Sequence, residues 1–232
     1  MMGSGPGELK ASSMLVTYAI GDVHGALHKL QGLVARCEQH AEGRLHKYLF
    51  LGDYIDRGPH SADVVRFLID LPAKTPAQVV TLLGNHEAML LATIDGAMPA
   101  EDWLWQGGAA TLRSYGVADA SQLPPDHIEW LRQLMLTHDD GRRFFVHAGV
   151  NPQLPLDAQD EFDLLWIREP FLTDERDYGR LIVHGHTPLS SGIPDLQRNR
   201  LNLDTGAVFG GPLTAAAFSD EATPPLSFLQ AE

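Results

Sequence analysis

Five short segments of the chain combine glycine with side chains that can bind metal ions or transfer protons. Gly, Asn and Asp are common turn residues, so each segment by itself is consistent with a simple turn. Turns alone do not require Asp, His and Asn together at these places. The segments are Gly21-Asp22-Val23-His24-Gly25, Gly52-Asp53-Tyr54-Ile55-Asp56-Arg57-Gly58, Gly84-Asn85-His86-Glu87, His147-Ala148-Gly149 and His184-Gly185-His186-Thr187.

The carboxylate, amide and imidazole groups of these segments predict a site for two divalent metal ions. Asp22 and His24 are two residues apart, so both point to one side if the segment is extended. The Asp53 carboxylate has enough lone pairs to bridge two cations. Ligand positions left open for water are typical of a catalytic site. The predicted ligands are Asp22, His24 and Asp53 for one ion, and Asp53, Asn85, His147 and His186 for the other.

The charge and ligand types of this site predict both its substrate and its metal. Two divalent ions would outweigh the charges of two aspartates, so the site can attract a phosphate dianion although the whole chain is acidic. Mn²⁺ is the favoured ion, with Fe or Zn²⁺ as alternatives, because a shell of oxygen and imidazole ligands suits these metals better than Mg²⁺.

Four further side chains are candidates for catalysis and substrate binding. Asn85 and His86 are adjacent and would point opposite ways in an extended stretch, which leaves His86 free to act as a general acid. Asp56 could hold the other ring nitrogen of His86. Arg57 and Arg168 are candidates to bind phosphoryl oxygens, because a guanidinium group can donate two parallel hydrogen bonds.

Two other polar positions are interpreted as structural. His184 and His186 would share one face of an extended strand, so spacing alone cannot choose between them. We favour His186 as the ligand and a supporting or structural role for His184. Asp204-Thr205-Gly206 follows a predicted strand and is interpreted as a turn.

Short apolar runs that precede the five segments predict buried strands. Helical patterns lie between them, at 27–37, 64–71 behind a cap at Ser61, 88–94 and 128–135. The last third, with runs at 200–203, 213–218 and 226–229, indicates antiparallel strands and turns. The order predicts an α/β fold with mixed sheets, in which the polar segments lie at strand ends. The five strands are predicted at 15–20, 48–51, 79–83, 144–146 and 181–183.

Length and composition narrow the class of protein. The 232 residues are consistent with one domain, expected at 14–232, and residues 1–13 resemble a cloning remnant. A net charge of −13 argues against binding to nucleic acid or to an anionic membrane. No apolar run is long enough to span a bilayer, so a cytoplasmic location is expected. The single cysteine, Cys37, has helical spacing to apolar residues and is expected to be buried.

The order and amino-acid sequences of these segments resemble the motifs of the phosphoprotein phosphatase (PPP) family of the calcineurin-like metallophosphoesterases. The resemblance rests on Gly-Asp-Val-His-Gly at 21, Gly-Asp-Tyr-Ile-Asp-Arg-Gly at 52 and Gly-Asn-His-Glu at 84, and it runs from about 15 to 210. It implies a sandwich of two mixed β-sheets flanked by helices, with a dinuclear metal centre at the sheet edge. Related metallophosphoesterases carry a further His where this chain has Pro188. The resemblance assigns metal-ligand positions to Asp22, His24, Asp53, Asn85, His147 and His186, the acid pair to His86 and Asp56, and phosphate binding to Arg57 and Arg168.

The function expected from this resemblance is metal-dependent hydrolysis of phosphomonoesters by an activated hydroxide. The preferred substrate is a phosphoprotein or phosphopeptide carrying phosphoserine or phosphothreonine, as in the bacterial and phage branch. The alternative is a symmetrical dinucleoside polyphosphate hydrolase, similar to a diadenosine tetraphosphatase. That family typically lacks the aspartate before the arginine of the second segment, so Asp56 argues against it. A phosphate-binding protein without catalysis is expected to lack ligands, and none is missing.

Overall fold

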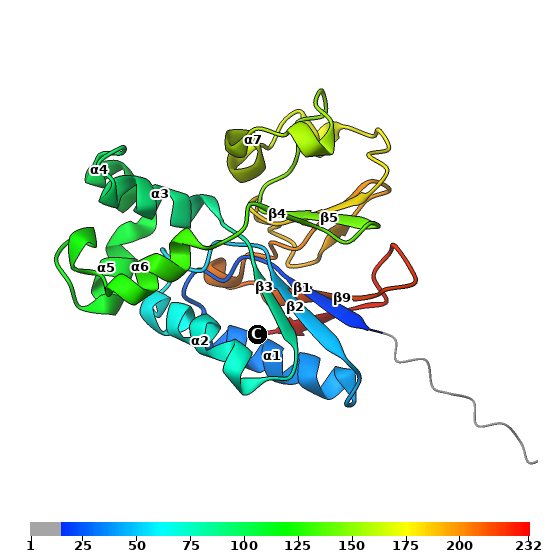
Figure 1. Cartoon of the computed structure of the whole chain (residues 1–232), viewed down its shortest axis with the longest axis horizontal. Coiled ribbons are helices and arrows are strands. Elements are labelled where there is room, and N and C mark those ends of the chain that lie inside the picture. Colours follow the sequence, from blue (N-terminus) through cyan, green and yellow to red (C-terminus); the bar gives the residue numbers. More distant parts are fainter. Residues whose placement is uncertain (1–14) are drawn as a thin grey trace, which may run out of the picture.

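Two five-stranded β-sheets face each other at the centre of the protein (Figure 1). The computed structural model describes residues 15–232, so the predicted cloning remnant at 1–13 lies outside the described residues. The first sheet has the order β10-β9-β1-β2-β3, in which β1 pairs in parallel with β2 and antiparallel with β9. Its strands are β1 (Val16–Ile20), β2 (His46–Phe50), β3 (Gln78–Thr81), β9 (Leu213–Ser219) and β10 (Ser227–Ala231).

The second sheet has the order β4-β5-β6-β8-β7 and is also mixed. Strand β8 pairs in parallel with β6, which corrects the prediction that the last third is antiparallel throughout. The chain at 185–199 is long enough for the crossover that parallel pairing needs. The predicted α/β fold with two mixed sheets is confirmed. The strands are β4 (Thr137–Asp139), β5 (Arg143–Val146), β6 (Leu181–His184), β7 (Asp195–Leu196) and β8 (Arg200–Asn202).

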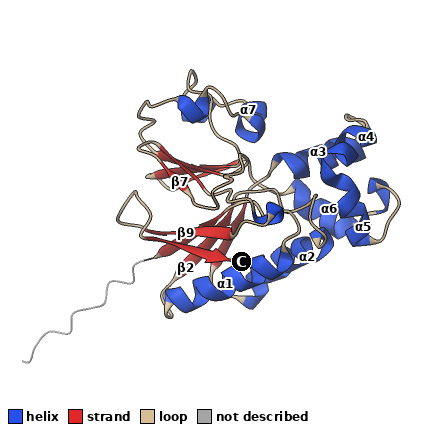
Figure 2. Cartoon of the chain, turned by 180° about the vertical axis from the view of Figure 1, so that it is seen from behind, coloured by secondary structure: helices blue, strands red, loops and turns tan. Residues whose placement is uncertain are grey.

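Helices cover the outer faces of the sheets. Figure 2 shows α1 and α2 along the first sheet, α7 beyond the second, and α3 to α6 grouped at one end. Over residues 15–232, none of the helices has both the length and the apolar character needed to cross a membrane. The helices are α1 (Leu27–Ala41), α2 (Ser61–Lys74), α3 (Asn85–Ile94), α4 (Ala100–Trp103), α5 (Ala109–Tyr115), α6 (Pro125–Arg132) and α7 (Glu161–Trp166).

Alternation along the strands divides the apolar side chains between separate layers. In β1, Tyr18 and Ile20 pack toward the helices on the outer face, whereas Ala19 packs between the two sheets. In β5, Phe145 joins the layer between the sheets and Phe144 faces α7. This follows from the twofold period of a strand. Because both faces of each sheet are covered, polar side chains that follow the strands collect at the sheet edge.

Several helix ends differ from the sequence-based expectation, and hydrogen bonds accompany two of the differences. Ser61 is the first residue of α2 rather than its cap, and its hydroxyl accepts the Asp56 N–H at 3.1 Å. Helix α6 ends at Arg132, because the following residues bond to the strand segment beside them and the Met135 carbonyl accepts the Leu83 N–H. Helices α4, α5 and α7 were not predicted. Cys37 is fully buried in the core, as expected.

Candidate metal centre

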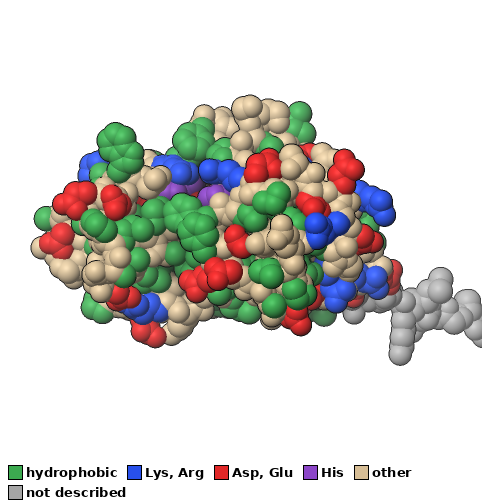
Figure 3. Space-filling model, turned by 90° about the horizontal axis from the view of Figure 1, so that it is seen from above, with side chains coloured by type: hydrophobic (Ala, Val, Ile, Leu, Met, Phe, Trp, Pro, Cys, Tyr) green, Lys and Arg blue, Asp and Glu red, His purple; other side chains and the backbone are tan. Residues whose placement is uncertain are grey.

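The five polar segments follow β1, β2, β3, β5 and β6 and meet at one end of the sandwich. The His86 N–H donates to the Asp53 carboxylate, and the His186 N–H donates to the Asp22 carboxylate, so segments far apart in the chain are joined. Figure 3 shows histidine side chains recessed in the face that it draws, with Lys or Arg and hydrophobic side chains around them. The expectation that strand ends place the polar segments together is therefore confirmed.

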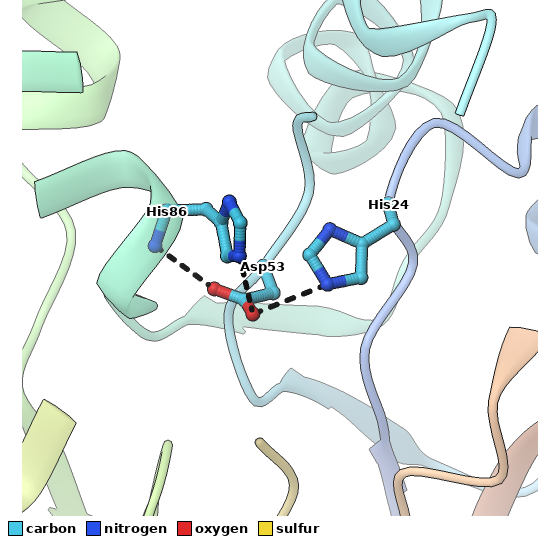
Figure 4. A group of neighbouring side chains, drawn as sticks. All are labelled: His24, Asp53 and His86. Carbon is cyan, nitrogen blue, oxygen red and sulfur yellow. Dashed lines mark hydrogen bonds and ion pairs between the residues drawn. The ribbon is translucent and has the colours of Figure 1, made fainter. Parts of the chain in front are cut away.

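One candidate metal-binding group consists of His24, Asp53 and His86 (Figure 4), whose ligand atoms all lie within 4.8 Å of one another. The His24 Nε2 lies 3.3 Å from the Asp53 carboxylate and the His86 Nε2 lies 4.0 Å from it. The His24 Nδ1–H donates to the Ile55 carbonyl at 2.7 Å, which leaves the lone pair on Nε2, the atom that lies near both Asp53 and Arg57. Such a bond to the backbone is typical of histidines that bind metals.

The second candidate group consists of Asp53, His147 and His186, again with all ligand atoms within 4.8 Å. The Asn85 Oδ1 lies 2.8 Å from the His147 Nε2 and 3.0 Å from the His186 Nδ1, so the side-chain amide oxygen of Asn85 lies beside the ligand atoms of this second group. The His147 Nδ1–H donates to the Leu51 carbonyl at 2.9 Å. Asp53 therefore belongs to both groups, which is the arrangement expected of a bridging carboxylate.

The geometry that separates Asn85 from His86 is helical, not extended. Both residues lie in the first turn of α3, where successive side chains are rotated by about 100°. Asn85 faces the second group, whereas the His86 Nδ1–H donates to Asp56 at 2.7 Å. Asn85 and His86 have different partners, as predicted. The prediction assumed an extended backbone at these residues, and that assumption is wrong.

Asp22, a predicted ligand, belongs to neither donor group and lies against the backbone of the last segment. Its carboxylate accepts the His186 N–H, and a Cβ on Gly185 would collide with it, so only glycine permits this approach. Burial and the charges of Asp204 and Asp53 raise the pKa of Asp22 well above its usual range. Burial also raises the pKa of Asp204 to about 6. Asp204 was interpreted as a turn residue, but the structure places it beside the site.

These residues fit divalent cations. The His186 Nε2 is buried and has no hydrogen-bond partner among the described residues. Burial lowers the pKa of His147, and that of His186 to about 3, so the His186 ring is held in the neutral form that binds metal. Three buried carboxylates, those of Asp22, Asp53 and Asp204, repel one another and would be stabilised by positive ions.

Asp56 holds the predicted general acid in place. Its carboxylate also accepts the Trp103 indole N–H at 2.9 Å and the Thr111 hydroxyl at 2.6 Å, and Asp56 is fully buried. The His86 Nε2 remains directed toward Asp53. The structure thus brings the predicted acid pair together, with Trp103 and Thr111 as supporting residues that sequence reasoning missed.

Both predicted phosphate-binding arginines line a cavity of about 180 Å³ that opens onto Asp53, Asn85 and His186. The Arg57 Nη1–H donates to the His24 Nε2 at 2.7 Å, and the guanidinium lies over the Phe209 ring at 5.6 Å. The Arg168 Nη2–H donates to the His186 carbonyl at 3.4 Å. The other residues that line the cavity are Gln106, Trp166, Pro188 and Phe209.

Backbone strain is concentrated at the site. Within residues 15–232, six non-glycine residues have positive φ, and five of them belong to the predicted site. For L residues this conformation is unfavourable and persists only where the surroundings enforce it. The six are His24 (44°), Glu42 (50°), Asp53 (54°), Asp56 (71°), Arg57 (65°) and His186 (63°).

Glu87 is one group that enforces this backbone. Its carboxylate accepts the N–H groups of Asp53 at 2.9 Å, Tyr54 at 2.7 Å and Ile55 at 3.1 Å. Burial and the charge of Asp53 raise the pKa of Glu87 to about 8, although the backbone donors oppose the shift. Glu87 lies in the third segment but was given no role. Its place in the first turn of a helix was the available signal, because acidic residues there often accept backbone N–H groups.

The end of β6 separates His184 from His186. His184 is the last strand residue and faces the outer layer, with its ring 5.0 Å from that of Phe171. The chain turns at Gly185, and the positive φ of His186 directs this side chain to the second group. Sequence spacing could not choose between His184 and His186, because the alternation of side chains along the strand ends at the turn.

We expect His186→Ala to lose bound metal and His184→Ala to retain it. His186 supplies a ligand atom to the second group, whereas the His184 ring packs against Phe171. Elemental analysis of both purified variants measures the effect, with thermal unfolding as the control for the cavity that each change leaves. Equal metal loss from the two variants would contradict the assignment.

The fold and the two donor groups define a metal-dependent phosphoesterase, a hydrolase with His and Asp side chains placed for a dinuclear metal site. The family model described as Calcineurin-like phosphoesterase matches residues 15–213. The chain belongs to that family.

Curated relatives carry the names of tetraphosphatases. The chain is 35% identical over 141 residues to a symmetrical bis(5'-nucleosyl)-tetraphosphatase of Dechloromonas aromatica, a match that covers 60% of this chain and 45% of the relative. It is 28% identical over 232 residues to the asymmetrical bis(5'-nucleosyl)-tetraphosphatase PrpE of Anoxybacillus flavithermus, covering 88% of this chain and 91% of the relative. The chain thus spans less than half of the symmetrical relative and nearly all of the asymmetrical one.

Solved structures confirm the fold. One, described provisionally as a diadenosine tetraphosphatase, superposes with a TM-score of 0.71 at 23% identity, over 97% of this chain and 96% of that one. A protein serine/threonine phosphatase of Saccharomyces cerevisiae superposes with a TM-score of 0.61 at 17% identity, over 90% of this chain and 74% of that one. The resemblance stated from the sequence is confirmed for the calcineurin-like family, whereas the names of the relatives support the alternative function better than the protein phosphatase.

Proposed function

We propose that the chain is a metal-dependent hydrolase of bis(5'-nucleosyl) tetraphosphates. The observation that carries the proposal is the cavity at the metal centre, where Arg57 and Arg168 lie beside the aromatic rings of Trp166 and Phe209. Guanidinium groups suit phosphoryl oxygens, and aromatic rings suit nucleobases. The names of the curated relatives support the same substrate class.

The chain's own residues would bind and orient the polyphosphate. Arg57 and Arg168 would hold phosphoryl oxygens, and His86, kept in place by Asp56, would donate a proton from Nε2 to the departing oxygen. When bound, divalent ions would polarise the phosphoryl group and acidify water. Asp22, His24, Asp53, Asn85, His147 and His186 would hold them, and Mn²⁺ remains the favoured ion.

We further propose asymmetrical cleavage, in which diadenosine tetraphosphate and water give ATP and AMP. One P–O bond between the α- and β-phosphates breaks, water supplies the oxygen and protons, and no other reactant is needed. Support comes from the relatives that align with nearly the whole chain, which carry the asymmetrical name. Asp56, which argued against the symmetrical alternative, is consistent with this choice.

The second candidate is the serine/threonine protein phosphatase expected from the sequence. The hydrogen-bonded pair of His86 and Asp56 favours it, because a serine alkoxide leaves poorly unless it is protonated. A polyphosphate leaving group is already a stabilised anion and needs this acid less. The pair would therefore contribute less to the hydrolysis of a tetraphosphate than to that of a phosphoserine ester.

Competition kinetics decides between the two candidates. With Mn²⁺, we expect the full chain to hydrolyse diadenosine tetraphosphate with a higher kcat/KM than a phosphoserine peptide, and chromatography to show equal amounts of ATP and AMP. The Asp53→Asn variant is the control for contaminating hydrolases. ADP as the sole product would contradict asymmetrical cleavage, and a preference for the peptide would establish the second candidate instead.

A further inference from the structure

The central cavity is flanked by two grooves with which it shares walls. Trp166 lines both the cavity and a groove between α3 and α7, and Pro188 and Phe209 line both the cavity and a groove between the loops at 188–192 and 205–211. The cavity measures about 180 Å³, whereas sites for small organic ligands measure roughly 300–1,000 Å³. It can hold phosphates, but the rest of a larger substrate must extend into the grooves.

The first groove is lined mainly by apolar side chains, together with Asp160 and Glu161, and carries a stacked aromatic pair. Phe162 is 67% exposed, and its ring stacks with that of Trp166 at a centroid distance of 6.3 Å and an angle of 23°. Met89, Ala92 and Met98 form the opposite wall. Thioether groups contact aromatic rings favourably. The groove thus offers an apolar slot of the kind that a planar ring can occupy.

The second groove presents a single exposed ring and meets the cavity at other wall residues than the first groove does. Phe209 is 65% exposed and lies in a short turn of 3₁₀ helix, Ala207–Phe209. The Arg57 guanidinium covers one face of this ring. Ser190 and Thr205 line the same groove. Hydrophobic side chains also border the recessed histidines in the view of Figure 3.

We propose that the two grooves bind the two nucleosides of one substrate molecule, while the bridging phosphates lie in the central cavity. The inference rests on the proposed function. Along the surface the order is aromatic groove, arginine-lined cavity, aromatic groove, and a dinucleoside polyphosphate has the same order of base, phosphates and base. One base stacks on the rings of Phe162 and Trp166, and the other stacks on Phe209, because every base offers a π-face to an aromatic ring.

The test compares two substrates in the variants Phe162→Ala and Phe209→Ala. The readout is the kcat/KM for diadenosine tetraphosphate divided by that for phenyl phosphate, which lacks nucleosides. We expect each variant to lower this ratio about tenfold, and the double variant about a hundredfold, since the sites are separate. Phe162→Tyr and Phe209→Tyr keep the ring and should retain most of the ratio. Leu45→Ala removes an exposed side chain at the opposite end of β2 and is the matched control.

The outcomes separate this inference from the proposed function. If the unaltered chain does not prefer diadenosine tetraphosphate to the phosphopeptide, the proposed function fails. If it does prefer it, but either alanine variant keeps the ratio of the unaltered chain, the assignment of one nucleoside to each groove is wrong. Residual hydrolysis of phenyl phosphate by the variants shows that they are folded.

Discussion

Replacement of Asp53 by Asn is expected to remove both metal ions and reduce phosphoester hydrolysis to the uncatalysed level. Asp53 supplies a ligand atom to both donor groups, whereas every other member serves one of them. The amide has nearly the same shape but no charge. Burial would raise the pKa of Asp53, yet His147, His86 and His24 hold it well below its usual range, so the carboxylate is ionised and ready to bind cations. Elemental analysis and kcat with Mn²⁺ measure the effect.

The control for this variant is Asp70→Asn, which removes an exposed carboxylate that pairs with Lys74 on α2. Such surface pairs contribute little to stability, so activity and metal content should not change. The unaltered chain treated with a chelator is the second arm, and activity should return when Mn²⁺ is added. Full turnover by the chelated protein would refute the metal-dependent mechanism, and two ions bound to Asp53→Asn would refute the bridging role.

Replacement of His86 by Asn is expected to lower kcat by about a hundredfold to ten-thousandfold while both ions stay bound, as for the loss of a general acid. The His86 ring is held by Asp56 through Nδ1, and its Nε2 lies 4.0 Å from the carboxylate of Asp53, which lines the cavity. The deficit should be larger for phenyl phosphate than for nitrophenyl phosphate, whose leaving group needs less protonation. Steady-state kinetics with both esters gives the comparison.

The competing assignment for His86 is metal binding, because its Nε2 lies in the first donor group with His24 and Asp53. Asn85→Ala provides the contrast, since Asn85 contacts the second group and its loss should reduce metal occupancy. Should His86→Asn lose an ion while Asn85→Ala keeps both, the two roles are reversed. An equal deficit with both esters would also argue against a proton donor.

The sequence by itself determined the chemistry of the site and the fold that carries it. Residue type is local information, so Asp22, Asp53 and His147 could be recognised as ligand candidates from the glycine-flanked segments in which they occur. The apolar runs before those segments predicted the strands, and the carboxyl ends of neighbouring strands meet at one edge whatever lies between them. The α/β fold with mixed sheets follows from this information, and the motifs in the same segments carry the resemblance that implied the family and its sandwich of two sheets.

Only the tertiary structure decided where individual side chains point. Asn85 and His86 diverge because a helix begins at Asn85, and His184 lies outside the site because the chain turns at Gly185. Glu87 and Asp204 became supporting groups through contacts with residues distant in the sequence. The physical reason is that direction depends on local φ and on long-range hydrogen bonds, and left-handed backbone in particular breaks the periodicity that sequence patterns rely on.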